Sequence, residues 1–256
     1  MPQRLLLLDE AARYLHVDAA RLEKWVKRHE IPFESQGGKR TVFHRGELDA
    51  WASQRILSMQ GKRLAEYHAQ ASAQTQQYLN GQAPLVCGLL GAGRVAPSLR
   101  SHTKASVLRD LVAVAEVANL LFDPKDLLNS LEEREALCST GLPGGLALLH
   151  PRYHDAYLAG DSFLIIGRAL HPLPFGAPDG KATDLFFLLC CLDDRLHLHA
   201  LARICTVCQT TDLLARLRAA GDAQAMRDAA CACEDEVVSH MQQGAGVTGR
   251  YGASRQ

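Results

Sequence analysis

Apolar residues are spaced in two different ways along this chain, and the spacing changes near residue 56. Before that point they recur every three to four residues between charged residues, which predicts small amphipathic helices. From about residue 85 helical spacing alternates with continuous apolar runs, and such runs predict strands that are buried on both faces. This alternation is typical of an α/β fold in which a mixed sheet is flanked by helices.

The first part of the chain, residues 1–55, predicts a small domain built as helix, turn, helix, hairpin and helix. Asp18 is placed to cap the second helix, Ile31-Pro32 ends that helix, and Gly37-Gly38 predicts a tight turn. The segment holds ten basic and eight acidic residues, so it carries +2 within a chain of zero formal charge and leaves −2 for the remainder.

Basic side chains occur on the second predicted helix and at the tip of the hairpin. Such a helix can enter the major groove of duplex DNA while hairpin cations contact the phosphates. A small interaction domain with solvated charges is the alternative, because a net charge of +2 is modest for a DNA-binding domain. The predicted DNA contacts are Arg21, Lys24, Lys27, Arg28, Lys39 and Arg40.

The order of these elements adds a resemblance. The residues that carry it are Glu10-Ala11-Ala12, Leu15, Val17, Leu22, Ile31-Pro32, Gly38, Arg40 and Leu48-Asp49-Ala50-Trp51. Across about fifty residues the segment resembles the excisionase-type, MerR-like winged helix-turn-helix family, which implies DNA binding. It departs from the family where His16 and His29 replace turn glycines, where Leu7 replaces a capping Ser or Thr, and where Ala19 replaces a polar residue.

Residues 56–84 are rich in glutamine and alanine, with six and five of them. Leu57, Leu64, Ala71 and Tyr78 recur every seven residues, as in a weak dimerising helix that would make the protein a homodimer. The other positions of this seam are polar, which favours a solvated helical linker. We therefore treat 56–84 as a linker in helical form.

Residues 85–236 predict the larger α/β domain, and residues 237–256 a flexible tail. The predicted helices cover Thr103–Leu121, Asp123 to about Leu137, Arg195–Val207, Thr211–Arg218 and Asp222–Cys233. The predicted strands cover Gly145–Leu149, Ser162–Leu170 and Thr183–Cys191.

The longest apolar run, Leu185–Leu192, has eight residues and is too short to span a membrane. With no signal peptide, the eight cysteines predict reduced thiols, a cytoplasmic location and no membrane insertion. Cys205-x-x-Cys208 and Cys231-x-Cys233 suit zinc or a buried core. Their place in predicted helices favours the core, so we expect no metal and no cofactor.

The first predicted strand of this domain ends at His150, and Arg134 lies one helix upstream. His197 and His199 open the helix after the last strand. A neutral imidazole, with an ordinary pKa near 6.5, can attack a phosphoryl group, and a guanidinium with a second imidazole can stabilise the transferred oxygens. The turn Ser139, Thr140, Gly141 can add backbone donors. Spacing alone does not single out one of eleven histidines.

Three ordered motifs add a second resemblance: "REALCSTGLPGGLALLH", "PFGAPDGKATDLFFLLCC" and "HLHALARI". Together they resemble the enzyme IIA domain of the fructose/mannitol and nitrogen-regulatory branch of the bacterial sugar phosphotransferase system. The resemblance implies that His150 accepts phosphate from an HPr-like carrier, with Arg134 and His197 assisting, and His197 fits the family position better than His199. Leu149 stands where the family has proline.

The combined interpretation is a phosphotransferase-linked regulator with a DNA-binding head. Two alternatives remain at this stage: a phosphocarrier that passes phosphate to the IIB component of a sugar transporter, and a DNA-binding adaptor that is never phosphorylated.

Overall fold

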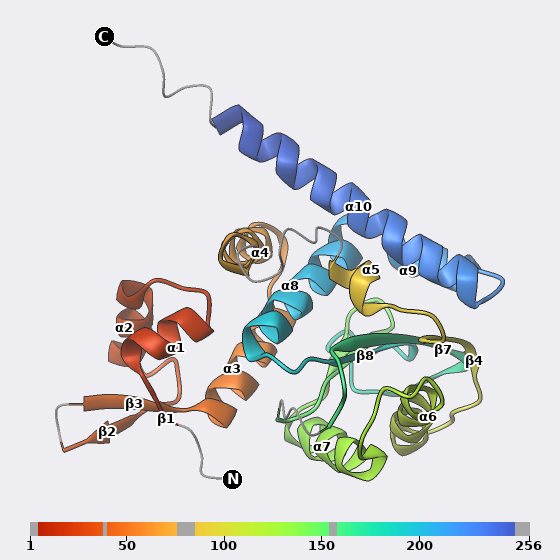
Figure 1. The fold of residues 1–256 in the computed structure, drawn as a ribbon, viewed down its shortest axis with the longest axis horizontal. Coiled ribbons are helices and arrows are strands. Elements are labelled where there is room, and N and C mark those ends of the chain that lie inside the picture. The colour runs from red at the N-terminus through yellow and green to blue at the C-terminus, as the bar shows by residue number, and fades with distance from the viewer. Residues whose placement is uncertain (1–4, 38–39, 76–84, 154–157, 249–256) are drawn as a thin grey trace.

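The computed structural model describes residues 5–37, 40–75, 85–153 and 158–248. Its N-terminal part places three helices beside a small antiparallel sheet with the strand order β1-β3-β2 (Figure 1). The elements are β1 (Leu5–Leu7), α1 (Leu8–Tyr14), α2 (Ala19–Lys27), β2 (Glu34–Gln36), β3 (Arg40–His44) and α3 (Arg45–Leu57). This arrangement confirms the predicted small helix-turn-helix region and adds β1, which the leucine run did not predict.

The departures from the helix-turn-helix pattern leave its local structure intact. His16 and His29 both have a φ of +54°, the left-handed backbone that favours glycine, at a cost of about 1 kcal/mol each. The carboxylate of Glu10 accepts a hydrogen bond from the Leu7 N–H at 2.9 Å, which is the half of a capping box that does not need a hydroxyl at position 7. Asp18 caps α2 as predicted, because it accepts from the Arg21 N–H at 2.6 Å.

The larger part of the chain is built on a mixed five-stranded sheet with the order β4-β7-β8-β6-β5. The strands are β4 (Val95–Leu99), β5 (Gly141–Leu142), β6 (Leu146–Leu149), β7 (Phe163–Leu173) and β8 (Thr183–Cys190). β6 and β8 run parallel as neighbours, with Leu149 opposite Leu188. Because parallel strands end at the same edge of a sheet, the residues that follow β6 and β8 come together.

Helices cover both faces of this sheet, which confirms the predicted fold class. The covering helices include α6 (Lys104–Val117), α7 (Pro124–Leu137) and α8 (Asp194–Thr210). Leu148, Phe187 and Leu189 share a core cluster with α8, whereas Leu149 and Leu188 belong to the cluster beneath α6 and α7. Alternate side chains of each strand point to opposite faces, so a continuous apolar run fills both cores.

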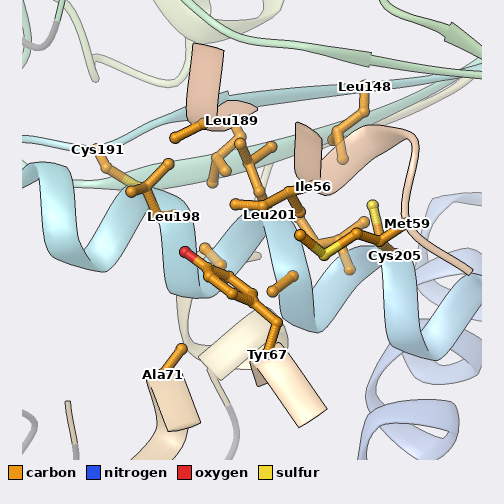
Figure 2. Packing of buried hydrophobic residues seen from close by; sticks show 14 of the residues in the cluster. Ile56, Met59, Tyr67, Ala71, Leu148, Leu189, Cys191, Leu198, Leu201 and Cys205 are labelled. Atoms are coloured by element: carbon orange, nitrogen blue, oxygen red, sulfur yellow. The ribbon is translucent and has the colours of Figure 1, made fainter. Parts of the chain in front are cut away.

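The segment predicted as a linker packs on the sheet domain through α4 (Gly61–Thr75). Leu64, Tyr67 and Ala71 are buried in the same core cluster as Leu198 and Leu201 of α8, and Figure 2 shows Tyr67 and Ala71 beside that helix. The seven-residue recurrence therefore faces α8 of the same chain rather than solvent or a second chain, within the described residues. Tyr78 lies outside them.

The remaining helices are α5 (Leu85–Leu89), α9 (Leu213–Ala219) and α10 (Ala223–Thr248). The sequence did not predict α5 or β4, and each of them is only five residues long. The flexible tail predicted from residue 237 is wrong as far as Thr248, because α10 continues while Val237 and Met241 stay packed on the core.

Two cysteines correct the expectation of eight reduced thiols. Cys87 of α5 and Cys231 of α10 form a disulfide, because these helices pack together with the two Cα atoms 5.0 Å apart. Cys205 is a core residue, and burial raises the pKa of its thiol to about 12.

Candidate functional site

The side chain of His150 follows β6 directly and is 1% exposed. Its Nδ1 lies 3.0 Å from the carbonyl oxygen of Leu148, which can only accept, so Nδ1 carries the proton. The other ring nitrogen, Nε2, accepts a hydrogen bond from the Nε–H of Arg134 at 3.0 Å. His150 therefore presents the lone pair of Nε2, which is the atom that a nucleophilic imidazole uses.

Leu149, which replaces the family's proline, is held by the sheet. It is 1% exposed and pairs with Leu188 in the ladder between β6 and β8. The strand thus keeps regular backbone geometry up to the residue before His150. The ladder restrains the backbone of Leu149, which has no proline ring to restrict φ.

Arg134 reaches the imidazole from the last turn of α7 and is 2% exposed. Its Nη1 donates to the carbonyl oxygen of Cys138 at 3.1 Å, and this bond anchors the guanidinium. Nη2 is buried and has no hydrogen-bond partner among the residues that the structure describes. A guanidinium stays protonated and a buried unpaired donor is costly, so this atom is suited to an anionic oxygen.

His197 comes from the first turns of α8 and is fully buried. Asp193 caps this helix by accepting from the Arg195 and Leu196 N–H groups at 2.9 and 3.0 Å. The ring centroids of His197 and His150 are 5.1 Å apart, so the helix start and the strand end meet at the shared edge of the sheet. The structure thus brings together the three residues for which catalysis is predicted: His150, His197 and Arg134.

His199 points away from that site. Its Nε2 lies 3.0 Å from the hydroxyl of Ser72 in α4, and burial lowers its pKa to about 2. The centre of its ring lies 5.7 Å from that of His68, and burial lowers the pKa of His68 to about 3. Residues two apart on a helix are rotated by about 200°, which explains why only one of the two histidines faces His150.

The turn Ser139, Thr140, Gly141 corrects the expectation of phosphoryl-stabilising donors. The hydroxyl and N–H of Thr140 both donate to the carboxylate of Glu135, at 2.7 and 3.0 Å. The Ser139 hydroxyl donates to the carbonyl oxygen of Phe175, and the Gly141 N–H donates to that hydroxyl oxygen. These donors are used within the chain, and their role here is to hold the turn between α7 and β6.

Four predicted DNA contacts lie on or beside α2 and one begins β3. Lys24, Lys27 and Arg28 are exposed, and Arg40 is exposed at the start of β3. Arg21 is half-buried, and its guanidinium carbon lies 5.3 Å from the centre of the Trp25 ring. Its charge therefore makes a cation–π contact within the domain. Lys39 lies outside the described residues.

Sequence reasoning missed Ser53, which α3 brings into the histidine site. This side chain is fully buried and its Oγ lies 3.3 Å from Nε2 of His197. The two residues are 144 positions apart in the chain. Nothing in the local pattern around Ser53 signals the contact, because it depends on how α3 packs on α8.

Comparisons with known proteins match the sheet domain and the helix-turn-helix region separately. Residues 89–229 match the family described as phosphoenolpyruvate-dependent sugar phosphotransferase system, EIIA 2, and residues 5–56 match a helix-turn-helix domain. The chain belongs to the EIIA 2 family and joins such a domain to a helix-turn-helix domain.

The curated relatives and solved structures that match cover the EIIA part. A nitrogen regulatory protein of Bradyrhizobium diazoefficiens is 30% identical over 144 residues, which are 55% of this chain and 91% of the relative. A nitrogen regulatory protein of Pseudomonas aeruginosa is 29% identical over 143 residues, 54% of this chain and 89% of the relative. The crystal structure of nitrogen regulatory protein IIA-Ntr from Neisseria meningitidis shares the fold, with a TM-score of 0.51 and 24% identity, over 57% of this chain and 99% of that one.

Among the residues that the structure describes, no helix is both long enough and apolar enough to cross a membrane.

Proposed function

We propose that this protein is a phosphotransferase-linked regulator in which His150 accepts a phosphoryl group from an HPr-like phosphohistidine carrier and the helix-turn-helix domain binds duplex DNA. The observation that carries the proposal is the arrangement around Nε2 of His150. Nε2 of His150 lies 3.0 Å from Nε of the buried Arg134, and the centres of the His150 and His197 rings are 5.1 Å apart.

The proposed transfer moves one phosphoryl group between two imidazoles. Nε2 of His150 attacks the phosphorus of the carrier's phosphohistidine, forms a new N–P bond, and the carrier's N–P bond breaks as its nitrogen regains the lone pair. Arg134 must then turn from Nε2 to the oxygens of the transferred group, which its unpaired Nη2 is suited to bind. Such pre-placed charge is typical of phosphoryl-transfer sites.

The direct test is to incubate the protein with phosphoenolpyruvate, enzyme I and an HPr-type carrier, and to map acid-labile phosphohistidine by mass spectrometry. We expect one phosphoryl group per chain, on His150. Passage of that group onward to an added IIB component would instead support a transport role, which the fructose-specific EIIABC component of Bacillus subtilis suggests at 25% identity over 142 residues.

DNA affinity should depend weakly on salt, because only a few exposed cations are offered by α2 and the hairpin. We expect a slope of log affinity against log salt on the order of −3 to −5 per monomer. Replacing Lys24 and Lys27 by alanine should reduce the magnitude of that slope by about one unit each, as fluorescence anisotropy at several salt concentrations can measure. Lys125→Ala, which removes an exposed lysine from α7, is the matched control, and an unchanged slope in the α2 variant would contradict the assignment.

Phosphorylation should change DNA affinity about five- to a hundredfold, the usual range for coupling between two sites. The reason is that a phosphoryl group adds negative charge and strong acceptors beside Arg134 and His197, in a protein whose two domains share one core. Operator affinity of unphosphorylated and fully phosphorylated protein, compared at one salt concentration, measures the effect. Equal affinities would leave two independent domains on one chain.

A further inference from the structure

All three side chains of the proposed phosphoryl site are closed to solvent. His150, Arg134 and His197 are 1%, 2% and 0% exposed. Transfer between two proteins requires the carrier's phosphorus to come within about 3–3.5 Å of the attacking nitrogen. A carrier protein cannot bring its phosphohistidine that close while the site stays closed.

One wall of the closed site belongs to the helix-turn-helix domain. Ser53 of α3 contacts His197 through its hydroxyl, 3.3 Å from Nε2, and has no exposed surface. At the start of the same helix Gly46 lies against Tyr153, three residues after His150, so closely that an added Cβ would stand 3.0 Å from the ring. Helix α3 therefore contacts the site both through His197 and through the chain that follows His150.

A second set of contacts holds this domain in place against α8. Leu64 and Ala71 of α4 are buried with Leu198 and Leu201, and Figure 1 shows α3 and α4 beside α8. The imidazole of His16 adds a polar link, because its Nε2 lies 3.1 Å from the carbonyl oxygen of Arg195, two residues before His197. We use the term docked head for residues 5–75 in this arrangement.

We propose that the docked head is an autoinhibitory cover: His150 becomes accessible to a phosphohistidine carrier only when α3 and α4 leave α8. This inference rests on the proposed function. Lys24, Lys27 and Arg28 stay exposed in the docked form, so the contact restrains the phosphoryl site and leaves the predicted DNA-binding helix open. Since linkage is reciprocal, a phosphoryl group on His150 must in turn favour the undocked head.

The first experiment measures closure without any carrier. Diethyl pyrocarbonate transfers an ethoxycarbonyl group to an unprotonated imidazole nitrogen and releases ethanol and carbon dioxide, and peptide mapping reports each histidine. In the intact chain His150 and His197 should react at least about tenfold more slowly than the exposed His29 and His240. Equal rates at the buried and exposed histidines would overturn the proposal.

The second experiment opens the cover from outside the site. Ala71→Glu places a charge at a fully buried position of α4, whereas Ala69→Glu makes the same change on the exposed face of that helix. Ala71→Glu should raise the rates of ethoxycarbonylation and of carrier-driven labelling at His150 at least about tenfold, the effect of tenfold more open protein, while Ala69→Glu should match wild type.

Hydrogen exchange of α3 and α4 shows independently whether Ala71→Glu has released the head. Released helices with unchanged rates at His150 would overturn the autoinhibitory cover. Faster ethoxycarbonylation without labelling by any carrier would support the cover and remove the proposed phosphoryl acceptance, so the two failures are distinguishable.

Discussion

Replacing His150 by alanine is expected to abolish carrier-dependent, acid-labile labelling of this protein. The side chain supplies the lone pair that the proposal uses, because its Nδ1–H is bound to the Leu148 carbonyl oxygen and its Nε2 faces Arg134. Autoradiography or phosphohistidine mapping after incubation with the carrier measures the result. His240→Ala, at an exposed position of α10, is the matched control and should keep full labelling.

Replacing Arg134 or His197 by alanine should slow the labelling of His150 without abolishing it. Removal of one pre-placed electrostatic group from a transition state typically costs about 10²–10³-fold in rate, and we expect Arg134→Ala to fall in this range. Lysine cannot reproduce the directed guanidinium donors, so Arg134→Lys should restore little. Label that persists in His150→Ala, at an unchanged rate, would exclude His150 as the acceptor.

Loss of the Glu234 carboxylate is expected to cause the largest stability change. This side chain of α10 is fully buried and accepts hydrogen bonds from the N–H groups of Val86 and Cys87, both at 2.8 Å. It also lies 3.4 Å from Nη1 of Arg203, a guanidinium that is only 6% exposed. Glu234→Ala would leave the buried guanidinium of Arg203 without its carboxylate and the N–H groups of Val86 and Cys87 without their acceptor, so the free energy of unfolding should fall by about 3–5 kcal/mol.

Urea unfolding followed by circular dichroism measures that fall as a lower midpoint. Glu236→Ala is the matched control on the same helix, because it removes a half-exposed carboxylate that pairs with Arg216 at the surface. Exposed ion pairs contribute little to the free energy of unfolding. We therefore expect Glu236→Ala to unfold at the same urea midpoint as the wild-type protein. A midpoint of Glu234→Ala equal to that of wild type would show that α5 and Arg203 find other partners.

Local features of the fold follow directly from the sequence. Asp18 caps the helix that it precedes, because a short carboxylate at this position reaches the free N–H groups of the first turn. The apolar run Leu185–Leu192 indicates β8, since a short run of eight apolar residues is typical of a strand covered on both faces. Arg134, His150 and His197 could be named in advance because they belong to ordered motifs that resemble a known domain.

Long-range packing decided the remaining features. The contacts of Ser53 with His197 and of Glu234 with α5 join residues 144 to 148 positions apart. The sequence pattern around these residues does not predict such contacts. The seven-residue recurrence of 56–84 indicates a helix, but the helix surface alone does not say whether solvent, a second chain or α8 covers it. The sequence by itself determined the long helices, the buried strands and the histidine that follows one of those strands. Only the tertiary structure decided that α3 of the head packs against His197 beside that histidine, because burial depends on which surfaces meet.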